Sequence, residues 1–235
     1  MNKSIRDITP MMNSRKFPVA TVLLIVSNLL IFAFGILTNS QTMIIANFGF
    51  VPDSVFNRND FDGYPSPSYM FQADPIHEED AATNTVVRLL SSMFIHASIT
   101  HIVFNMAALA FIGSYSEKSV GTGRYAIIYF LSGICAAFFH GVFASYVLGG
   151  GQTLLIGASG AISGVLGIAA ALGNRRAYYW LVIQIAFVFF GSVTSLPIAF
   201  TAHIGGFLAG VVLTKLMVNG ESFQRRGVST QDYST

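Results

Sequence analysis

The chain has 235 residues, of which 53% are apolar and only 10% are charged, and its formal net charge is +2. Soluble domains carry about 25% Asp, Glu, Lys and Arg, because a folded surface that faces water needs charge. The shortage of charge indicates that a lipid bilayer is the solvent for most of this chain. The small net charge gives no electrostatic basis for binding nucleic acid.

The sequence has no pattern typical of a metal or cofactor site. Its histidines and its single cysteine, Cys135, do not form a cluster with the spacing of metal ligands, so we expect no metal and no cofactor. His77 lies in an acidic loop and His140 in an apolar stretch, and each is interpreted as a solvated or hydrogen-bonded histidine. A lone cysteine cannot form an internal disulfide, so cysteine usage does not indicate a redox compartment.

Six apolar runs are long enough to cross a bilayer as helices, which requires about 20 residues for roughly 30 Å of hydrocarbon. The runs are Phe17–Leu37, Ile99–Tyr115, Tyr125–Leu148, Leu154–Leu172, Ala177–Phe200 and Ala202–Val218. The first run is longer than the apolar core of a signal peptide, and no small-residue cleavage site follows it, so it is interpreted as a spanning helix. The pattern predicts an all-α, polytopic membrane protein with a bundle of six transmembrane helices.

The basic residues predict the orientation of this bundle, since Lys and Arg accumulate on the cytoplasmic side of membrane proteins. With the N-terminus in the cytoplasm, the outer side holds two basic residues, Arg58 and Arg88. The inner side then holds eleven: Lys3, Arg6, Arg15, Lys16, Lys118, Arg124, Arg175, Arg176, Lys215, Arg225 and Arg226. We therefore expect a multi-pass protein of the cell (plasma) membrane with both termini in the cytoplasm.

This orientation divides the chain into three parts. We expect residues 1–16 to be a cytoplasmic N-terminal segment, residues 17–218 a single membrane domain, and residues 219–235 a cytoplasmic C-terminal tail. The long loop at 39–97 then lies outside. Its acidic tract Asp60–Ala82 is rich in Pro, Ser and Gly and is interpreted as mostly irregular.

Four polar residues on three of the predicted spans stand out, because polar groups inside a membrane are costly and therefore suggest function. His101 and Asn105 are four residues apart on one face of the second span, Ser159 is in the fourth and His203 is in the sixth. Because these three spans all enter from outside, the four residues fall at a similar depth near the outer ends of their helices. The sequence thus predicts one polar site assembled from three helices.

Small residues on two of these spans allow their backbones to approach closely in lipid. The small-xxx-small faces are Gly157-x-x-x-Ala161 and Gly160-x-x-x-Gly164 on span four, and Ala202-x-x-x-Gly206-x-x-x-Gly210 on span six. Ordinary helix packing would also use such faces. Because a serine and a histidine lie beside them, we expect the closer contact that a nucleophile and its base require, about 2.6–3.2 Å.

A serine hydroxyl becomes a nucleophile when a neutral histidine takes its proton, so Ser159 and His203 are the candidate catalytic pair. The Asp and Glu residues all lie outside the spans, with Glu117 at a helix end. We therefore expect a dyad in which His203 is oriented by packing or by a hydroxyl such as that of Ser163. Ser159 N–H, near a helix N-terminus, together with His101 and Asn105, are the candidate oxyanion donors.

Three pieces of the sequence, taken together, resemble the rhomboid intramembrane proteases. They are His96-Ala97-Ser98-Ile99-Thr100-His101-x-x-x-Asn105, Gly157-Ala158-Ser159-Gly160 and Ala202-His203-x-x-Gly206-x-x-x-Gly210. The pieces follow the family's order on spans two, four and six, and the likeness covers roughly residues 17–218. It implies a Ser159–His203 dyad, an oxyanion hole that includes His101 and Asn105, and membrane-spanning protein substrates.

The resemblance also implies a six-helix bundle with a water-filled cavity open to the outside and an outer loop partly in the membrane. His96, Gly157, Gly160 and Ser163 are expected to support the site. For His96 a structural role in its loop is the alternative, and for His101 and Asn105 the alternative is hydrogen bonding between helices. The aromatic stretch 178–180 is interpreted as part of an interfacial belt.

The chain departs from the family's usual pattern at three places. Val87-Arg88 stands where a Trp-Arg pair is common, and Glu117-Lys118-Ser119 stands where Glu-x-Arg is common. Ser163 replaces a tyrosine that commonly packs on the catalytic histidine. These departures concern how the outer loop is anchored and how His203 is oriented, and they leave the predicted reaction unchanged.

Other functions fit the sequence less well. A rhomboid-like pseudoprotease would bind transmembrane clients without cutting them, but such relatives typically lack the serine or the histidine. A small transporter would be expected to show an inverted repeat and an ion-binding carboxylate in its spans. A soluble esterase would need a glycine two residues after the serine, where Ala161 stands.

Overall fold

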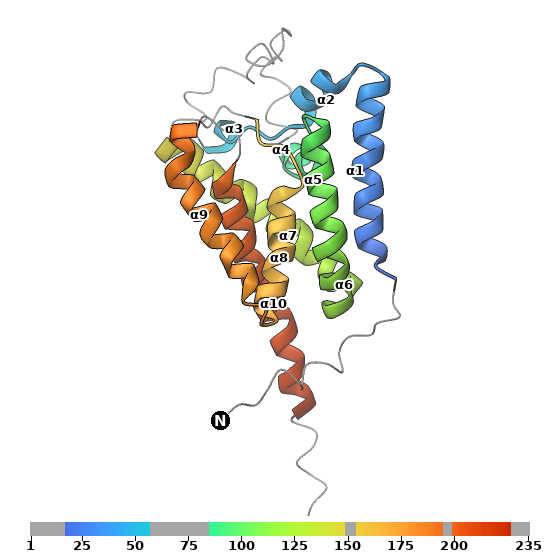
Figure 1. The fold of residues 1–235 in the computed structure, drawn as a ribbon, viewed down its shortest axis with the longest axis vertical. Helices are drawn as coiled ribbons and strands as arrows, with labels where there is room; N and C mark the ends of the chain where they lie inside the picture. The colour runs from blue at the N-terminus through green and yellow to red at the C-terminus, as the bar shows by residue number, and fades with distance from the viewer. Residues whose placement is uncertain (1–16, 57–84, 149–153, 195–198, 227–235) are drawn as a thin grey trace, which may run out of the picture.

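The structure is a computed structural model that describes residues 17–56, 85–148, 154–194 and 199–226. Over these residues the chain is helical, and the one strand-like pairing there is an isolated antiparallel bridge between Phe50 and Leu155. Figure 1 shows the long helices side by side, with the shorter helices α2, α3 and α4 grouped at one end. The predicted all-α class is confirmed.

Long helices occupy all six predicted places. They are α1 (Val19–Leu37), α5 (Ile99–Ala108) continued through η7 (Leu109–Gly113) into α6 (Ser114–Val120), α7 (Thr122–Phe143) continued by η8 (Ala144–Leu148), α8 (Ser159–Ala171), α9 (Arg176–Thr194) and α10 (Phe200–Arg226). The outer loop contributes α2 (Gln41–Phe48), α3 (Asp53–Phe56), α4 (Thr85–Ser91) and η6 (Ser92–Phe94). Its predicted irregular tract Asp60–Ala82 lies outside the described residues.

Four stretches among the described residues are long and apolar enough to cross a membrane. They are Val19–Leu37, Ile99–Val120, Thr122–Val147 and Phe200–Val218, whereas the apolar parts of α8 and α9 are shorter. Large apolar side chains on the outside of the bundle, such as Phe104 and Phe111, are 74% and 81% exposed. Since water would not tolerate such a surface, the chain is an integral multi-pass membrane protein, as its composition predicted.

Several predicted boundaries were wrong; the second span, for example, does not end at Tyr115 but continues as helix to Val120. The fourth helix does not begin at Leu154 but at Ser159, because Gly157 has a φ of +110° and Leu155 forms backbone hydrogen bonds with Phe50 instead of helical ones. The last helix does not end at Val218 but continues to Arg226, so part of the predicted C-terminal tail is helical.

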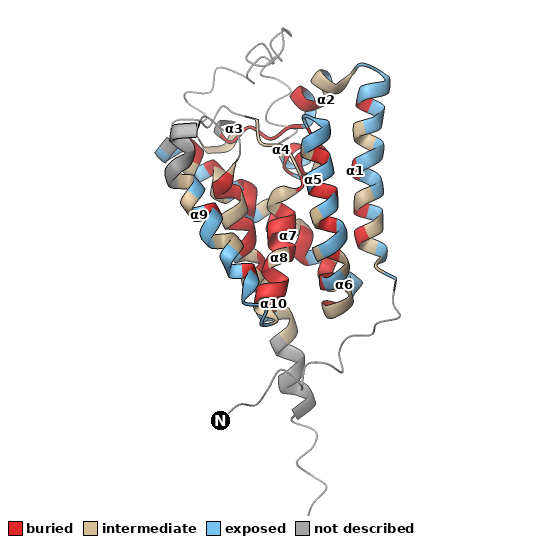
Figure 2. Ribbon diagram, viewed as in Figure 1, coloured by how far each residue is buried: buried red, intermediate tan, exposed pale blue. Residues whose placement is uncertain are grey.

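Helix α8 lies at the centre of the bundle, packed against α7 and α10, and Figure 2 shows it as mostly buried. Val165 and Ile168 on α8 are fully buried. At 1.5 Å per residue, a helix of 13 residues is about 20 Å long, which is shorter than the roughly 30 Å hydrocarbon layer. At least one end of α8 therefore lies inside such a layer, where protein must satisfy its backbone.

The central contact between α8 and α10 is made by glycines, as the small-xxx-small faces predicted. A Cβ atom added to Gly206 would lie 2.1 Å from the carbonyl oxygen of Gly160. One added to Gly210 would lie 2.0 Å from the carbonyl oxygen of Gly164. The two backbones are thus as close as glycine permits, and this contact fixes the register of α10 against α8.

Glu117 on α6 joins the second predicted span to the first. Its carboxylate accepts hydrogen bonds from the backbone N–H groups of Ala20 and Thr21 and from the hydroxyls of Thr21 and Thr122, at 2.8–3.0 Å. The N-terminal N–H groups of a helix have no partner within the helix, and the helix dipole favours an anion there. Glu117 therefore anchors the start of α1.

The outer loop is held on the bundle by Arg88 and Gln41. The Arg88 guanidinium is buried and donates to the carbonyl oxygens of Ala46 and Gly49, which ties α4 to the end of α2. The Gln41 side-chain amide donates to the carbonyl oxygen of His96 at 2.5 Å. Arg88 thus anchors the loop although Val87 precedes it in place of a tryptophan.

The glycine contact yields a stability prediction. Replacing Gly206 with Ala places a methyl group against the backbone of α8, so we expect a loss of about 1–3 kcal/mol in unfolding free energy, as for other overpacked sites. Thermal unfolding in detergent measures it. Gly123→Ala is the matched control, because its added Cβ would meet nothing within 4 Å. An unchanged melting temperature for Gly206→Ala would show that α8 and α10 are not in this contact.

Candidate active site

Ser159 is the first residue of α8 and follows a short non-helical segment that the rest of the protein holds in place. The backbone N–H of Gly157 donates to the carbonyl oxygen of Ser92 at 2.9 Å. The left-handed φ of Gly157 turns the chain into the helix, which leaves the N–H groups of the first turn of α8 directed away from the helix. Ser159 is half-buried at this position.

The hydroxyl of Ser159 lies 2.8 Å from Nε2 of His203, which is on the adjacent helix α10. This distance is within the range that proton transfer between a nucleophile and its base requires. The expected proximity of these two residues is therefore present. This proximity results from the contact between Gly160 and Gly206. Gly160 directly follows Ser159, and Gly206 is about one turn after His203, so each polar residue lies next to the glycine face of its helix.

The other ring nitrogen of His203, Nδ1, lies 2.7 Å from Oε1 of Gln184 on α9. Gln184 is 8% exposed, and this contact extends the polar series from Ser159 through His203 to a third helix. Sequence reasoning missed Gln184. The signal was available, since a glutamine within an apolar run is as costly as the polar residues that were noticed.

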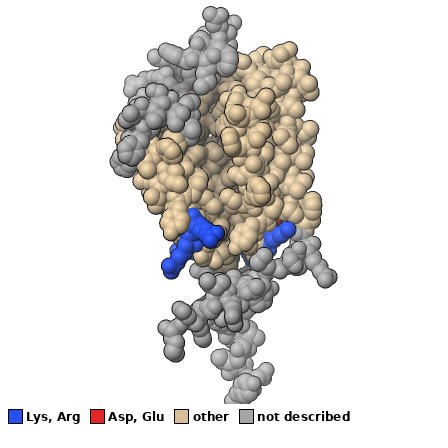
Figure 3. Space-filling model, viewed as in Figure 1, with Lys and Arg blue, Asp and Glu red and all other residues tan. Residues whose placement is uncertain are grey.

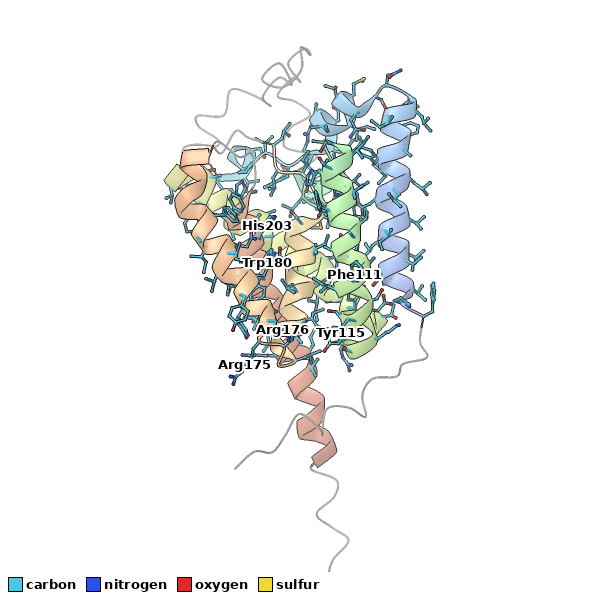
Figure 4. The ribbon with its side chains drawn as sticks, viewed as in Figure 1. Phe111, Tyr115, Arg175, Arg176, Trp180 and His203 are labelled. Atoms are coloured by element: carbon cyan, nitrogen blue, oxygen red, sulfur yellow. The ribbon has the colours of Figure 1, made fainter. Side chains whose placement is uncertain are left out.

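Aromatic rings pack around His203. The ring centroid of Trp180 is 5.8 Å from that of His203, and Phe200 approaches edge-on at 6.3 Å. Figure 4 shows Trp180 and His203 close together, well away from Arg175 and Arg176. Trp180 also stacks on Phe207 of α10, so this residue of the predicted interfacial belt has its ring against the bundle.

Ser163 does not contact His203. Its hydroxyl instead donates to the carbonyl oxygen of Ser159 at 2.6 Å, one helical turn earlier on α8. The prediction that a hydroxyl such as that of Ser163 orients His203 is therefore wrong, whereas the alternative of orientation by packing agrees with the ring contacts. The physical reason is that a serine within a helix can bond its own backbone at i−4.

His101 and Asn105 lie on α5 beside the segment that leads to Ser159. A Cβ added to Gly157 would lie 2.7 Å from Nε2 of His101, so the imidazole packs directly against this glycine. The side-chain amide of Asn105 donates to the carbonyl oxygen of His101 at 2.9 Å. An amide group has two N–H donors, so one donor of Asn105 remains for another acceptor.

His96 supports the same segment from behind. It is buried, its ring packs edge-on against His101 at 4.8 Å between centroids, and its Nε2 accepts from the backbone N–H of Ala158 at 3.5 Å. Burial, together with the smaller effect of the nearby His101, lowers the pKa of His96 to about 3. A neutral ring can accept this hydrogen bond, so His96 holds the residue before Ser159.

His140 is hydrogen-bonded, as expected for a lone histidine in an apolar span. Its Nδ1 lies 2.6 Å from the hydroxyl of Thr201, on the first turn of α10 and two residues before His203. This bond joins α7 to the start of α10. Thr201 was not noticed in the sequence because its partner is 61 residues away.

Apart from the buried Arg88 of α4, the basic residues that the structure describes lie toward the end of the bundle opposite the site (Figure 1). Figure 3 shows the coloured Lys and Arg side chains gathered toward one end, and Figure 4 labels Arg175 and Arg176 there, with His203 in the other half. Since α8 is about 20 Å long, Ser159 lies about 10 Å inside a 30 Å hydrocarbon layer if Ala171 is near the limit of that layer at the basic end.

A serine paired with a histidine, next to free N–H groups at a helix N-terminus, has the groups that acyl transfer needs. The sequence profile of the Rhomboid domain matches residues 83–220, more than half of the chain and all of the site described above. The chain belongs to the rhomboid family. Rhomboid proteins form helical polytopic bundles in the membrane, in agreement with this fold.

Curated rhomboid proteins include both proteases and an inactive member. The chain is 36% identical over 131 residues to rhomboid protease GluP of Bacillus subtilis, which covers 52% of this chain and 24% of GluP. It is 28% identical over 212 residues to rhomboid protease AarA of Providencia stuartii, and this match covers 78% of this chain and 73% of AarA. It is 31% identical over 130 residues to inactive RHOMBOID-like protein 8 of Arabidopsis thaliana, and this match covers 52% of this chain and 35% of that protein. For two of these three rhomboids, the match therefore spans well under two thirds of the relative.

Proposed function

We propose that this rhomboid is an intramembrane serine endopeptidase that hydrolyses peptide bonds in or near transmembrane segments of membrane proteins. The observation that carries the proposal is the 2.8 Å contact between the hydroxyl of Ser159 and Nε2 of His203 inside a lipid-embedded bundle. The family membership and the resemblance to the named proteases GluP and AarA support it.

The reaction follows from this pair. His203 takes the proton of Ser159 as its oxygen attacks the scissile carbonyl carbon, which gives a tetrahedral intermediate with a negatively charged oxygen. The imidazolium then donates the proton to the leaving nitrogen, and the C–N bond breaks. Water, activated by the same histidine, hydrolyses the acyl-enzyme and returns the proton to Ser159.

The negative oxygen needs donors that are in place before the reaction. The backbone N–H of Ser159 at the start of α8 is one, and the imidazole of His101 and the free N–H of Asn105 are the others we propose. The imidazole of His101 packs against Gly157 in the non-helical segment before Ser159, which places this candidate donor beside the start of α8.

The alternative function is a pseudoprotease that binds transmembrane clients without cleaving them, and the likeness to an inactive rhomboid-like protein supports this alternative. The retained serine, histidine and their hydrogen bond argue for catalysis. A fluorophosphonate probe, which reacts covalently with an activated serine, separates the two on purified protein. Labelling that disappears in Ser159→Ala supports the protease.

We further propose that residues 17–218 form the membrane domain, with both termini in the cytoplasm and the active site open to the outside of the cell membrane. The basic residues at the opposite end of the bundle support this orientation. Transmembrane substrates would then be cut in the outer half of the bilayer, at the depth of Ser159.

The pair itself is tested by replacing Ser159 or His203 with Ala. Either change is expected to abolish cleavage of a model transmembrane substrate and to leave the helical fold intact, because each removes a group that the reaction requires. The double variant should be hardly worse than the single ones, since the two residues act as a unit. Substantial proteolysis by purified Ser159→Ala would refute the assignment.

The role of Asn105 is tested by separating rate from stability. Asn105→Ala should lower kcat by about 10²–10³, equivalent to roughly 2.7–4 kcal/mol, with little change in KM. A purely structural hydrogen bond between helices is worth only about 0.6 kcal/mol and would appear as a lower melting temperature. Both quantities are measured on one preparation.

Asn28 provides a matched control for this test. Like Asn105, it is buried and donates its side-chain amide to a carbonyl oxygen four residues earlier, that of Leu24 at 2.8 Å, but it is on α1. Asn28→Ala should keep kcat in the folded fraction. If Asn105→Ala is destabilised yet fully active, Asn105 does not belong to the oxyanion hole.

The orientation is tested by cysteine labelling in a Cys135→Ala background. A cysteine at the exposed position Asn47 on α2 should react with a membrane-impermeant thiol reagent on whole cells, because this end is predicted to face outward. A cysteine at Gly123, exposed at the start of α7, should react only after lysis. The reverse pattern would move the active site to the cytoplasmic side.

A further inference from the structure

Gln184 on α9 contacts the side of His203 that faces away from Ser159. Its Oε1 lies 2.7 Å from Nδ1, and the residue is 8% exposed. An amide oxygen can only accept a hydrogen bond, so in this arrangement Nδ1 carries the proton. Nε2 then has a free lone pair directed at the hydroxyl of Ser159, 2.8 Å away.

We propose that Gln184 is the positioning residue of this site: its amide oxygen holds His203 in the tautomer that can accept the proton of Ser159. The proposal rests on the proposed protease function and names the group that completes it. In Ser-His-Asp sites a carboxylate has this role. Here Glu117, a buried carboxylate of the bundle, is engaged with the start of α1 and does not serve His203.

The aromatic contacts of His203 cannot replace this hydrogen bond. Trp180 and Phe200 pack against the ring at centroid distances of 5.8 and 6.3 Å and restrict where it lies. Neither ring distinguishes a protonated nitrogen from an unprotonated one at the imidazole edge. Of the groups in contact with His203 among the described residues, Gln184 is the one that bonds Nδ1.

The ionisable neighbours of His203 act from two other helices. His101 on α5 and His140 on α7 are close enough to influence it electrostatically, and His140 is itself bonded to Thr201. Neither supplies a negative charge. The site therefore orients its base with a neutral amide, which stabilises the imidazolium less than a carboxylate would.

Two substitutions at Gln184 test the proposal. Gln184→Leu keeps a similar size but has no hydrogen-bond acceptor. We expect kcat to fall by at least about 10-fold, with KM nearly unchanged. The upper limit is the roughly 10⁴-fold loss found when the histidine of a catalytic triad has the wrong tautomer. Gln184→Glu restores an acceptor of the same length. It should recover activity at high pH and move the acid limb of kcat/KM to higher pH, since a carboxylate favours the imidazolium.

The matched control is Ile183→Ala, the preceding residue on α9, which is 50% exposed on the outside of the bundle. It should leave both kcat and the pH profile unchanged. A merely structural role for Gln184 would lower the melting temperature of Gln184→Leu without moving the acid limb in Gln184→Glu. That result would overturn the proposal.

Nitrogen-15 NMR of histidine-labelled protein tests the tautomer without relying on activity. The His203 signals, identified by their loss in His203→Ala, should show Nδ1–H in the wild type and a shift toward Nε2–H in Gln184→Leu. Retention of the wild-type tautomer together with the wild-type kcat in Gln184→Leu refutes the proposal. If the wild type neither cleaves nor reacts with a fluorophosphonate, yet its tautomer depends on Gln184, the protease function fails and the positioning role stands.

Discussion

The glycine contact between α8 and α10 is the constraint on which the rest of the site depends. Carbonyl oxygens of Gly160 and Gly164 occupy the space where side chains on Gly206 and Gly210 would be. In lipid there is no hydrophobic force to press two apolar helices together, so close van der Waals packing of small faces supplies the association. The same contact brings the hydroxyl of Ser159 to 2.8 Å from Nε2 of His203, because each residue lies near the start of its helix, beside these glycines.

A serine site inside a membrane also needs polar backbone at a depth where lipid offers no hydrogen bonds. The segment before Ser159 meets this requirement through protein partners: Leu155 pairs with Phe50, Gly157 with Ser92, and Ala158 with His96. Irregular backbone at membrane depth is tolerated where protein covers it. The loop before α5 therefore supplies the hydrogen-bond partners that hold this segment and let α8 begin at Ser159.

The catalytic base, His203, is also oriented without a buried charge beside it. A carboxylate beside His203 would be expensive to desolvate in this bundle unless fully paired. An amide on α9 makes a hydrogen bond to Nδ1 at lower desolvation cost, and Trp180, one turn earlier, packs on the same imidazole. Helix α9 thus contributes both a polar and an apolar contact to His203, although nothing on α9 was expected to touch it.

The sequence by itself determined the solvent, the places of the six long helices and the polar residues on spans two, four and six, because hydropathy and motif spacing are local properties of the chain. Tertiary structure alone decided the contacts that depend on how helices rotate and stack. Gln184 reaches His203 across 19 residues, His140 reaches Thr201 across 61, and Trp180 packs its ring on His203. The tertiary structure also decided that α8 begins at Ser159, since the turn at Gly157 is held by hydrogen bonds from distant segments that no local pattern encodes.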